Sequence, residues 1–177
     1  MTGAVGDLRK DGKSCEFTSD WKVYNSSRRP IFSSMCILLL NGISCIISGS
    51  HDGHIRCLSR DTGKEIWSID LGSIIFSSPF PIASSNHVVV GTTAGELVVL
   101  KCTYETCFPI CSTRLDGEIY SSPICVMELV SSKYCNGRRE NTVTATHYDH
   151  DICCKIFVGS RDNSVANFIV SSLSTLN

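Results

Sequence analysis

One short phrase recurs at a fixed interval and constrains the fold more than any other feature of the sequence. It consists of an aromatic residue followed by two serines, and its aromatic positions lie 44 residues apart both times. The three copies are Phe32-Ser33-Ser34, Phe76-Ser77-Ser78 and Tyr120-Ser121-Ser122. A constant period of this size is typical of repeat proteins, in which each unit buries its apolar faces against its neighbours. The interval therefore predicts tandem structural units and argues against a self-contained active site.

The first complete unit has the pattern of four short antiparallel strands. Turn signals separate its apolar stretches, including Asn41-Gly42, which favours a tight hairpin, and Asp61-Thr62-Gly63-Lys64. His54–Leu58 alternates polar and apolar residues, as a half-buried strand does. The predicted strands are 31–40, 43–48, 54–58 and 65–69, and the second unit starts with a predicted strand at 75–82. Four such strands in about 40 residues are typical of one propeller blade.

The units organise nearly the whole chain. We expect a polar segment at 1–14 and a propeller region at 15–177 that starts with the last strand of a preceding blade. The expected parts of that region are this strand at 15–30, blades at 31–74 and 75–118, and an incomplete blade at 119–177 with an insertion near 131–151. The fold class is therefore all-β, a partial β-propeller of tandem four-stranded antiparallel blades, with about three blades and one orphan strand.

Charge and hydropathy exclude two classes of partner. The net charge is −1 and the pI is about 6.5, so the chain lacks the basic surface that nucleic-acid binding requires. The most apolar run, 35–47, is interrupted by a hairpin turn and is too short to cross a bilayer. The first 14 residues are polar and do not form a secretory signal. We therefore expect a cytoplasmic protein that binds neither nucleic acid nor membrane.

The sequence is rich in cysteine, with 11 residues and no C-x-x-C pair. Several cysteines stand where a strand needs a small apolar residue: Cys36, Cys45, Cys57, Cys102 and Cys125. Free cysteine behaves as a small hydrophobe in protein cores. We interpret these residues as reduced thiols in a reducing compartment.

The turn and strand at 49–58, followed by Thr62, Gly63, Lys64 and Trp67, resemble the pyrroloquinoline-quinone-type propeller repeat. In that family a Thr-Gly-Lys-x-x-Trp segment docks each blade on the next, so the resemblance implies this role for Trp67. Cys57 and Ser59 depart from the family's usual alanine and aspartate. WD40 repeats are the alternative, but their Trp-Asp signature is absent because Ser68 follows the tryptophan.

A narrower resemblance rests on Ile75–Pro79, Ile119–Pro123 and the stretch 158–165. These phrases resemble the C-terminal propeller of the aminoadipate-semialdehyde-dehydrogenase-type, or β-alanine-activating, acyl-activating enzymes. In that family an adenylate-forming domain and a phosphopantetheine carrier domain precede the propeller, and the sequence contains neither a nucleotide-binding loop nor a carrier motif. The resemblance implies a non-catalytic scaffold or interaction module whose partners are another protein or the upstream domains.

Two other functions stay open as alternatives. Cys153-Cys154 is similar to the adjacent-cysteine disulfide of some quinoprotein alcohol dehydrogenases, so the chain could be a fragment of a quinone-dependent oxidoreductase. That chemistry needs an enclosed cavity with calcium ligands and a stacking tryptophan, whereas both tryptophans are explained by blade docking; we therefore expect no cofactor. The second alternative is a propeller scaffold unrelated to acyl activation.

The sequence predicts no catalytic or metal site, although one set of residues is a candidate zinc site. His147, His150 and Cys153 are spaced three residues apart, and Cys135 lies at the start of the insertion. Nitrogen and sulfur ligands suit tetrahedral zinc, but this spacing matches no standard finger and flanking aspartates indicate a solvated loop. We therefore expect no metal.

The repeated serines also indicate structure, since a catalytic nucleophile would not recur in every unit. We expect their hydroxyls to bond local backbone and to let adjacent blades approach closely. No partner can be named for His51 as a general base. Finally, an open arc of about three blades exposes the apolar faces of its terminal blades, so we expect the isolated chain to self-associate or express poorly.

Overall fold

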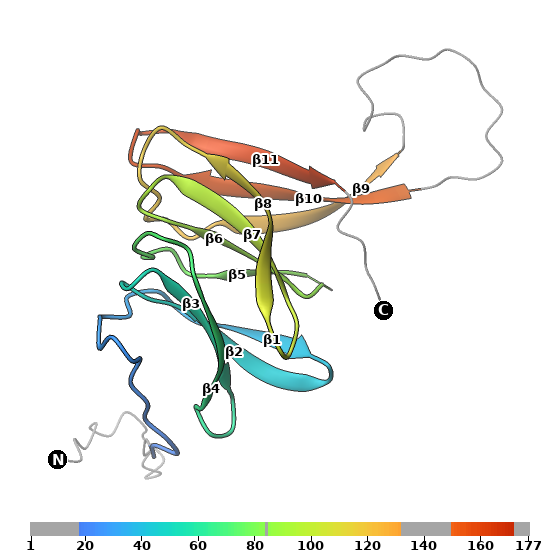
Figure 1. Cartoon of the computed structure of the whole chain (residues 1–177). Coiled ribbons are helices and arrows are strands. Elements are labelled where there is room, and N and C mark those ends of the chain that lie inside the picture. The colour runs from blue at the N-terminus through green and yellow to red at the C-terminus, as the bar shows by residue number, and fades with distance from the viewer. Residues whose placement is uncertain (1–17, 84, 132–149, 172–177) are drawn as a thin grey trace, which may run out of the picture.

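The protein forms three antiparallel sheets that lie one above another (Figure 1). The computed structural model describes residues 18–83, 85–131 and 150–171. Within these ranges the chain folds into eleven strands and no helix. The predicted all-β class is confirmed. The described residues contain no helix long and apolar enough to cross a membrane.

Each sheet is a meander in which every strand pairs with the next along the chain, and we call the sheets blade 1, blade 2 and blade 3. Blade 1 contains β1 Cys36–Leu40, β2 Ile43–Gly49, β3 His54–Ser59 and β4 Glu65–Asp70. Blade 2 contains β5 Phe80–Ile82, β6 His87–Gly91, β7 Glu96–Cys102 and β8 Cys107–Arg114. Blade 3 contains β9 Ile124–Ser131, β10 His150–Gly159 and β11 Val165–Ser171.

The tight turns follow from residues that tolerate a positive φ. Asn41 and Gly42 adopt φ values of 51° and 77° and close the β1–β2 hairpin, as the sequence predicts. At the next turn of each blade, Gly53, Gly95 and Asn163 have φ values of 85°, 80° and 66°. Asparagine is among the few non-glycine residues that enter this region. The third blade therefore keeps the turn although its glycine is replaced.

Two predicted strand boundaries are wrong for the same reason. The first strands of blades 1 and 2 begin at Cys36 and Phe80, not at residues 31 and 75. The preceding residues run between the blades, where their polar groups bond neighbouring turns instead of a strand ladder. Residues 18–30, the described part of the orphan strand predicted at 15–30, form no strand within the described residues.

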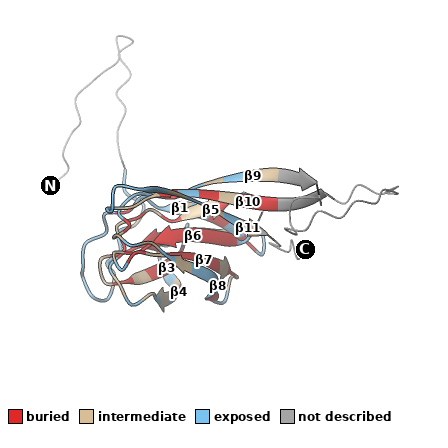
Figure 2. Cartoon of the chain, turned by 90° about the horizontal axis from the view of Figure 1, so that it is seen from above, coloured by how far each residue is buried: buried red, intermediate tan, exposed pale blue. Residues whose placement is uncertain are grey.

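Buried apolar residues form two clusters between the blades, and Figure 2 shows the buried residues concentrated in inner strands such as β6. One cluster joins blades 1 and 2 and includes Ile47, Ile55 and Trp67; the other joins blades 2 and 3. Every residue of β6 is buried, because blade 2 is covered on both faces. Each blade thus depends on its neighbours for burial, as expected for a repeat protein.

The insertion predicted near 131–151 connects two paired strands. Ser131 of β9 pairs with His150 of β10. Residues 132–149 lie outside the described part of the chain.

Candidate interaction surface

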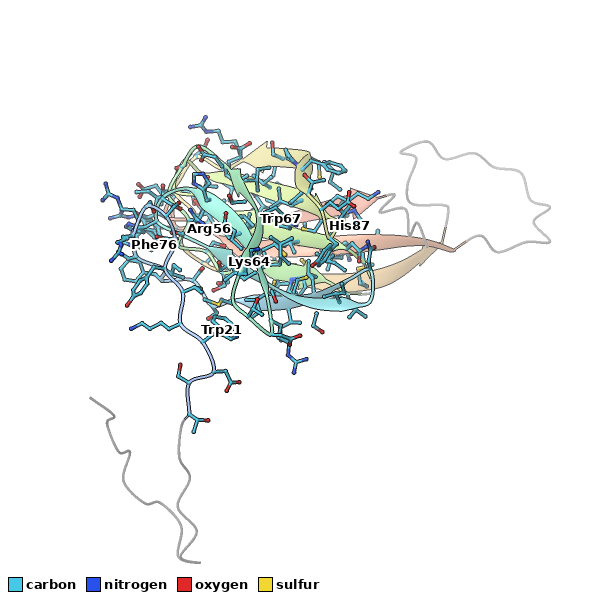
Figure 3. All side chains as sticks on the ribbon, turned by 60° about the horizontal axis from the view of Figure 1, so that its bottom comes forward. Trp21, Arg56, Lys64, Trp67, Phe76 and His87 are labelled. Carbon is cyan, nitrogen blue, oxygen red and sulfur yellow. The ribbon has the colours of Figure 1, made fainter. Side chains whose placement is uncertain are left out.

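The repeated aromatic residues form a continuous row across the three blades. The ring centroids of Phe32 and Phe76 are 5.5 Å apart, and those of Phe76 and Tyr120 are 4.9 Å apart. His51 packs edge-on against Phe32 at 5.2 Å and against Phe76 at 4.4 Å. We call these four residues the aromatic ridge. Figure 3 shows Phe76 at the opposite end of the molecule from His87.

The aromatic ridge is open to solvent along part of its length. Phe32 is 64% exposed and Tyr120 is 40% exposed, and Phe76 and His51 are half-buried. The guanidinium of Arg161 lies 5.6 Å from the centroid of the Tyr120 ring. His51 serves as one ring of this row, and its Nε2 has no hydrogen-bond partner among the described residues.

The first serine of each phrase bonds the backbone at the end of the second strand in its own blade. Ser33 Oγ donates to the Gly49 carbonyl oxygen at 2.9 Å. Ser77 Oγ accepts from the Gly91 N–H at 3.2 Å. In blade 3, Ser121 Oγ donates to the Gly159 carbonyl at 2.8 Å and accepts from the N–H of the same glycine at 2.9 Å. These bonds hold the phrase against its own sheet.

The second serine links adjacent blades. Ser34 N–H donates to Ser78 Oγ at 2.8 Å, and Ser78 N–H donates to Ser122 Oγ at 3.0 Å. The two serines thus have different structural uses that the sequence pattern does not separate. Their bonds to backbone groups and across close-packed blades agree with the structural role expected for them.

The isoleucines before Phe76 and Tyr120 each pack on a glycine of the preceding blade. A Cβ atom added at Gly49 would lie 2.6 Å from Ile75 Cγ2, and one at Gly91 would overlap Ile119. The same isoleucines donate their N–H groups to the Ser50 and Thr92 carbonyls, at 3.3 and 3.1 Å. Glycine is therefore required at these positions by the close approach of the next blade.

The tryptophans dock one blade on the next, as the resemblance implies. Trp67 is buried and its Nε1 donates to the Thr103 carbonyl in blade 2 at 3.0 Å. Trp21 makes the equivalent bond to the Arg60 carbonyl in blade 1 at 2.9 Å. Its ring covers Gly63, where any Cβ would overlap the indole. The docking role predicted for Trp67 is confirmed, although Trp21 belongs to no strand.

Ser78→Ala should remove the junction bond from Ser34 N–H and lower the free energy of unfolding by about 0.5–1.5 kcal/mol. The loss is modest because both groups are exposed and water can replace the hydroxyl. The measurement is urea unfolding followed by circular dichroism. Ser68→Ala is the matched control, since Ser68 is exposed on β4. Equal losses in the two variants would mean that the serine ladder contributes nothing.

A charged cluster is built around the buried side chain of Arg56. The Arg56 side chain is 5% exposed, and its two terminal nitrogens bond both oxygens of Asp52 at 2.9 and 2.5 Å. Its Nε lies 3.2 Å from Glu65 Oε2. Burial favours a higher pKa for Asp52, but hydrogen bonds from Arg56, Ser27 and the His54 N–H hold it well below its usual range. These contacts stabilise the turn, and the charges of Arg56 and Asp52 are paired with each other.

The described cysteines are free thiols, and burial makes three of them poor nucleophiles. Burial raises the pKa of Cys36 to about 11 and raises those of Cys57 and Cys125 well above the usual range. The thiolate is the reactive form, so these residues act as packing groups, as the sequence suggests. Cys153 and Cys154 are neighbours in β10 and both are free; successive strand residues point to opposite faces.

Two of the four residues of the zinc candidate lie outside the described residues, so the zinc site stays untested. Cys135 and His147 lie outside the described residues, His150 is placed only as part of β10, and Cys153 is buried in the same strand. No group of three potential metal ligands occurs among the residues that the structure describes. His87 is buried, and its pKa is lowered by burial and by the nearby charge of Lys101.

Comparison with known proteins supports the fold and gives one partial relative. No protein-family model matches the chain. The crystal structure of BamB from Moraxella catarrhalis aligns with a TM-score of 0.50 and 16% identity, over 82% of this chain and 35% of that one. BamB is a β-propeller of the pyrroloquinoline-quinone-like type, and so the predicted partial β-propeller is confirmed.

The second match is to a Beta-alanine-activating enzyme of Danio rerio. It is 32% identical over 84 residues, which are 45% of this chain and 7% of that protein. The chain therefore spans a small part of the length of the proteins that it matches.

Sequence reasoning missed the aromatic ridge as a surface. It identified the repeated aromatics from their spacing but assigned them to strands, where alternate residues would be buried. The constant period was itself a signal, since equivalent positions in stacked blades lie beside one another. His51 and the Arg56–Asp52 pair carry no comparable signal, because they occur in one blade only.

Proposed function

We propose that the chain is a non-catalytic interaction module of an ATP-dependent acyl-activating enzyme, with the aromatic ridge as its contact surface. The observation that carries the proposal is the exposure of the ridge. The other repeated groups, the serines, isoleucines, glycines and tryptophans, are used in packing one blade on the next. The aromatic rings alone combine this repetition with an open face.

The composition of the surface suits protein recognition. Aromatic residues and arginine are enriched where binding energy is concentrated in protein interfaces. Phe32 and Tyr120 present open ring surface, and Arg161 adds a planar cation beside the tyrosine. A net charge of −1 gives little electrostatic steering, so ring packing supplies most of the affinity.

The partner we propose is the upstream adenylate-forming and carrier domains of the same enzyme. The similarity to a Beta-alanine-activating enzyme supports this context, and the family resemblance implies that those domains precede the propeller. Free, buried thiols support a reducing cytoplasmic setting. Activation chemistry would belong to the upstream domains, and the module would position them.

The test is binding in trans. The adenylate-forming and carrier domains of the zebrafish enzyme, produced without the region that matches this chain, are mixed with the 177-residue chain and followed by calorimetry. We expect a dissociation constant of about 10 μM or tighter. Phe32→Ala should weaken binding by about tenfold, the loss of one moderate interface anchor.

Phe108→Ala is the matched control, because Phe108 is 44% exposed on β8, away from the ridge. It should leave the dissociation constant unchanged. Absence of binding, or equal weakening by the two variants, would contradict the proposed function.

A further inference from the structure

The two junctions between blades are made by the same contacts. Each outer blade carries the groups for one side of such a junction, without a neighbouring blade against them. At each junction an isoleucine covers a glycine, aromatic rings stack, and a serine N–H bonds the next serine. Blade 1 with residues 18–35 presents the part of this set that approaches a preceding blade, which we call the leading surface. Blade 3 presents the part that receives a following blade, which we call the trailing surface.

The trailing surface is open at the position of the receiving glycine. Gly159 is the last residue of β10, as Gly49 and Gly91 are the last residues of β2 and β6. A Cβ added at Gly159 would meet only Ser121, whose Oγ would be 3.3 Å away. No isoleucine covers it among the described residues. Val165 of β11 is 79% exposed, whereas its equivalents Ile55 and Leu97 are 0% and 2% exposed. An apolar face of the kind that is buried at the two junctions is therefore free.

The leading surface carries the complementary groups. Ile31 and Phe32 are 41% and 64% exposed, whereas Ile75 and Ile119 are fully buried in the preceding blade. Trp21 bonds Arg60 across blade 1 as Trp67 of β4 bonds Thr103 across blade 2. The segment around Trp21 thus holds the place of a fourth strand in a preceding blade, and blade 3 has three strands within the described residues.

We propose that the trailing surface of one copy receives the leading surface of a second copy, so that two copies close a ring of six blades. Ile31 of one copy would cover Gly159 of the other, and the segment around Trp21 would lie along the free edge of β11. Every copy has both surfaces, so a two-fold axis generates two identical junctions. Six blades lie within the range of about 4–8 found in closed propellers.

The second copy is favoured as the occupant because the trailing surface matches this chain's own groups position by position. Ile31 precedes its aromatic residue as Ile75 and Ile119 do, and it is exposed and able to cover Gly159. Phe32 would extend the row of rings beyond Tyr120. The inference depends on Ile31, Trp21 and Gly159, and the second copy would cover part of the open face of Phe32. Its test therefore changes residues outside the aromatic ridge, so that its failure is distinguishable from failure of the proposed function.

The test is the mass of the full chain and of two blocked variants in solution, by light scattering at about 50 μM, well above a micromolar dissociation constant. The wild type should have twice the mass of the 19.4 kDa chain. Gly159→Val fills the receiving site and Ile31→Asp charges the approaching residue, so each variant alone should be monomeric. A mixture of the two should recover the dimer, because one junction pairs the intact Ile31 with the intact Gly159.

Recovery in the mixture also shows that both variants fold. Ile110→Asp is the matched control: Ile110 is 41% exposed, as Ile31 is, but lies on β8 of blade 2, so this variant should stay dimeric. A monomeric wild type, variants that keep the dimer mass, or a mixture that stays monomeric would overturn the proposal. A surface completed by other blades of a longer chain would give the first of these results.

Discussion

Trp67→Ala should lower the free energy of unfolding by about 3–5 kcal/mol, the cost of removing a large buried aromatic side chain. The indole is 9% exposed in the core between blades 1 and 2, and its N–H is bonded to Thr103 of the next blade. Truncation leaves a cavity at the junction and also removes a bond that joins the two sheets. Small domains have total stabilities of roughly 5–15 kcal/mol, so the variant should be close to its unfolding threshold.

Two further variants separate packing from hydrogen bonding. Trp67→Phe keeps most of the ring but loses the N–H, and should cost about 1–3 kcal/mol. Trp21→Ala removes the same kind of bond from a half-buried ring, and should cost less than Trp67→Ala because less apolar area returns to water. Urea unfolding followed by circular dichroism measures all three. A loss below about 1 kcal/mol for Trp67→Ala would show that the blades do not depend on this junction.

Asp52→Ala should be comparably damaging, at about 3–5 kcal/mol, because it leaves a buried guanidinium without its main partner. The Arg56 side chain is 5% exposed. Its other acidic neighbour, Glu65, is 43% exposed and approaches only the Nε atom of Arg56. Removing both charges with Asp52→Ala and Arg56→Met should cost less than removing the aspartate alone. The two variants are compared by urea unfolding at neutral pH. A double variant that is less stable than the single one would contradict this account.

The same ion pair sets the response to acid. The pKa of Asp52 is lowered in the folded protein, so between its folded and unfolded pKa values the unfolded chain binds more protons. Stability from this group is therefore complete above the ordinary aspartate value of about 3.9 and is lost as the pH falls through the lowered value. Asp52→Asn should show a smaller stability loss than the wild type between about pH 5 and pH 2. Equal slopes for the two proteins would mean that other carboxyls control the acid response.

The fold was predictable because its signals are local and repeated. The 44-residue interval, the Asn41-Gly42 turn and the glycine turns each depend on a few adjacent residues. The docking role of Trp67 was predictable from the family resemblance. The strand starts at 31 and 75 were wrong because an apolar run has the same appearance whether it joins a ladder or bridges two blades.

The candidate site was predictable only as a list of repeated residues. Spacing marked Phe32, Phe76 and Tyr120 as equivalent, but it did not show that their rings would stack into one partly exposed row. Nor did it show that His51 would pack edge-on between two of them. Such contacts depend on how far apart adjacent blades lie, and that distance is set by Ile75 and Ile119 against Gly49 and Gly91.

The sequence by itself determined that this protein is a stack of blades, because a constant period and turn residues specify the unit and require neighbours to bury it. Tertiary structure alone decided the different uses of the two serines, the burial of Arg56 against Asp52, and the choice of exposed aromatic faces. The physical reason is that strand and turn propensities act within a few residues. Burial and inter-blade bonds arise only when positions 44 residues apart are brought side by side.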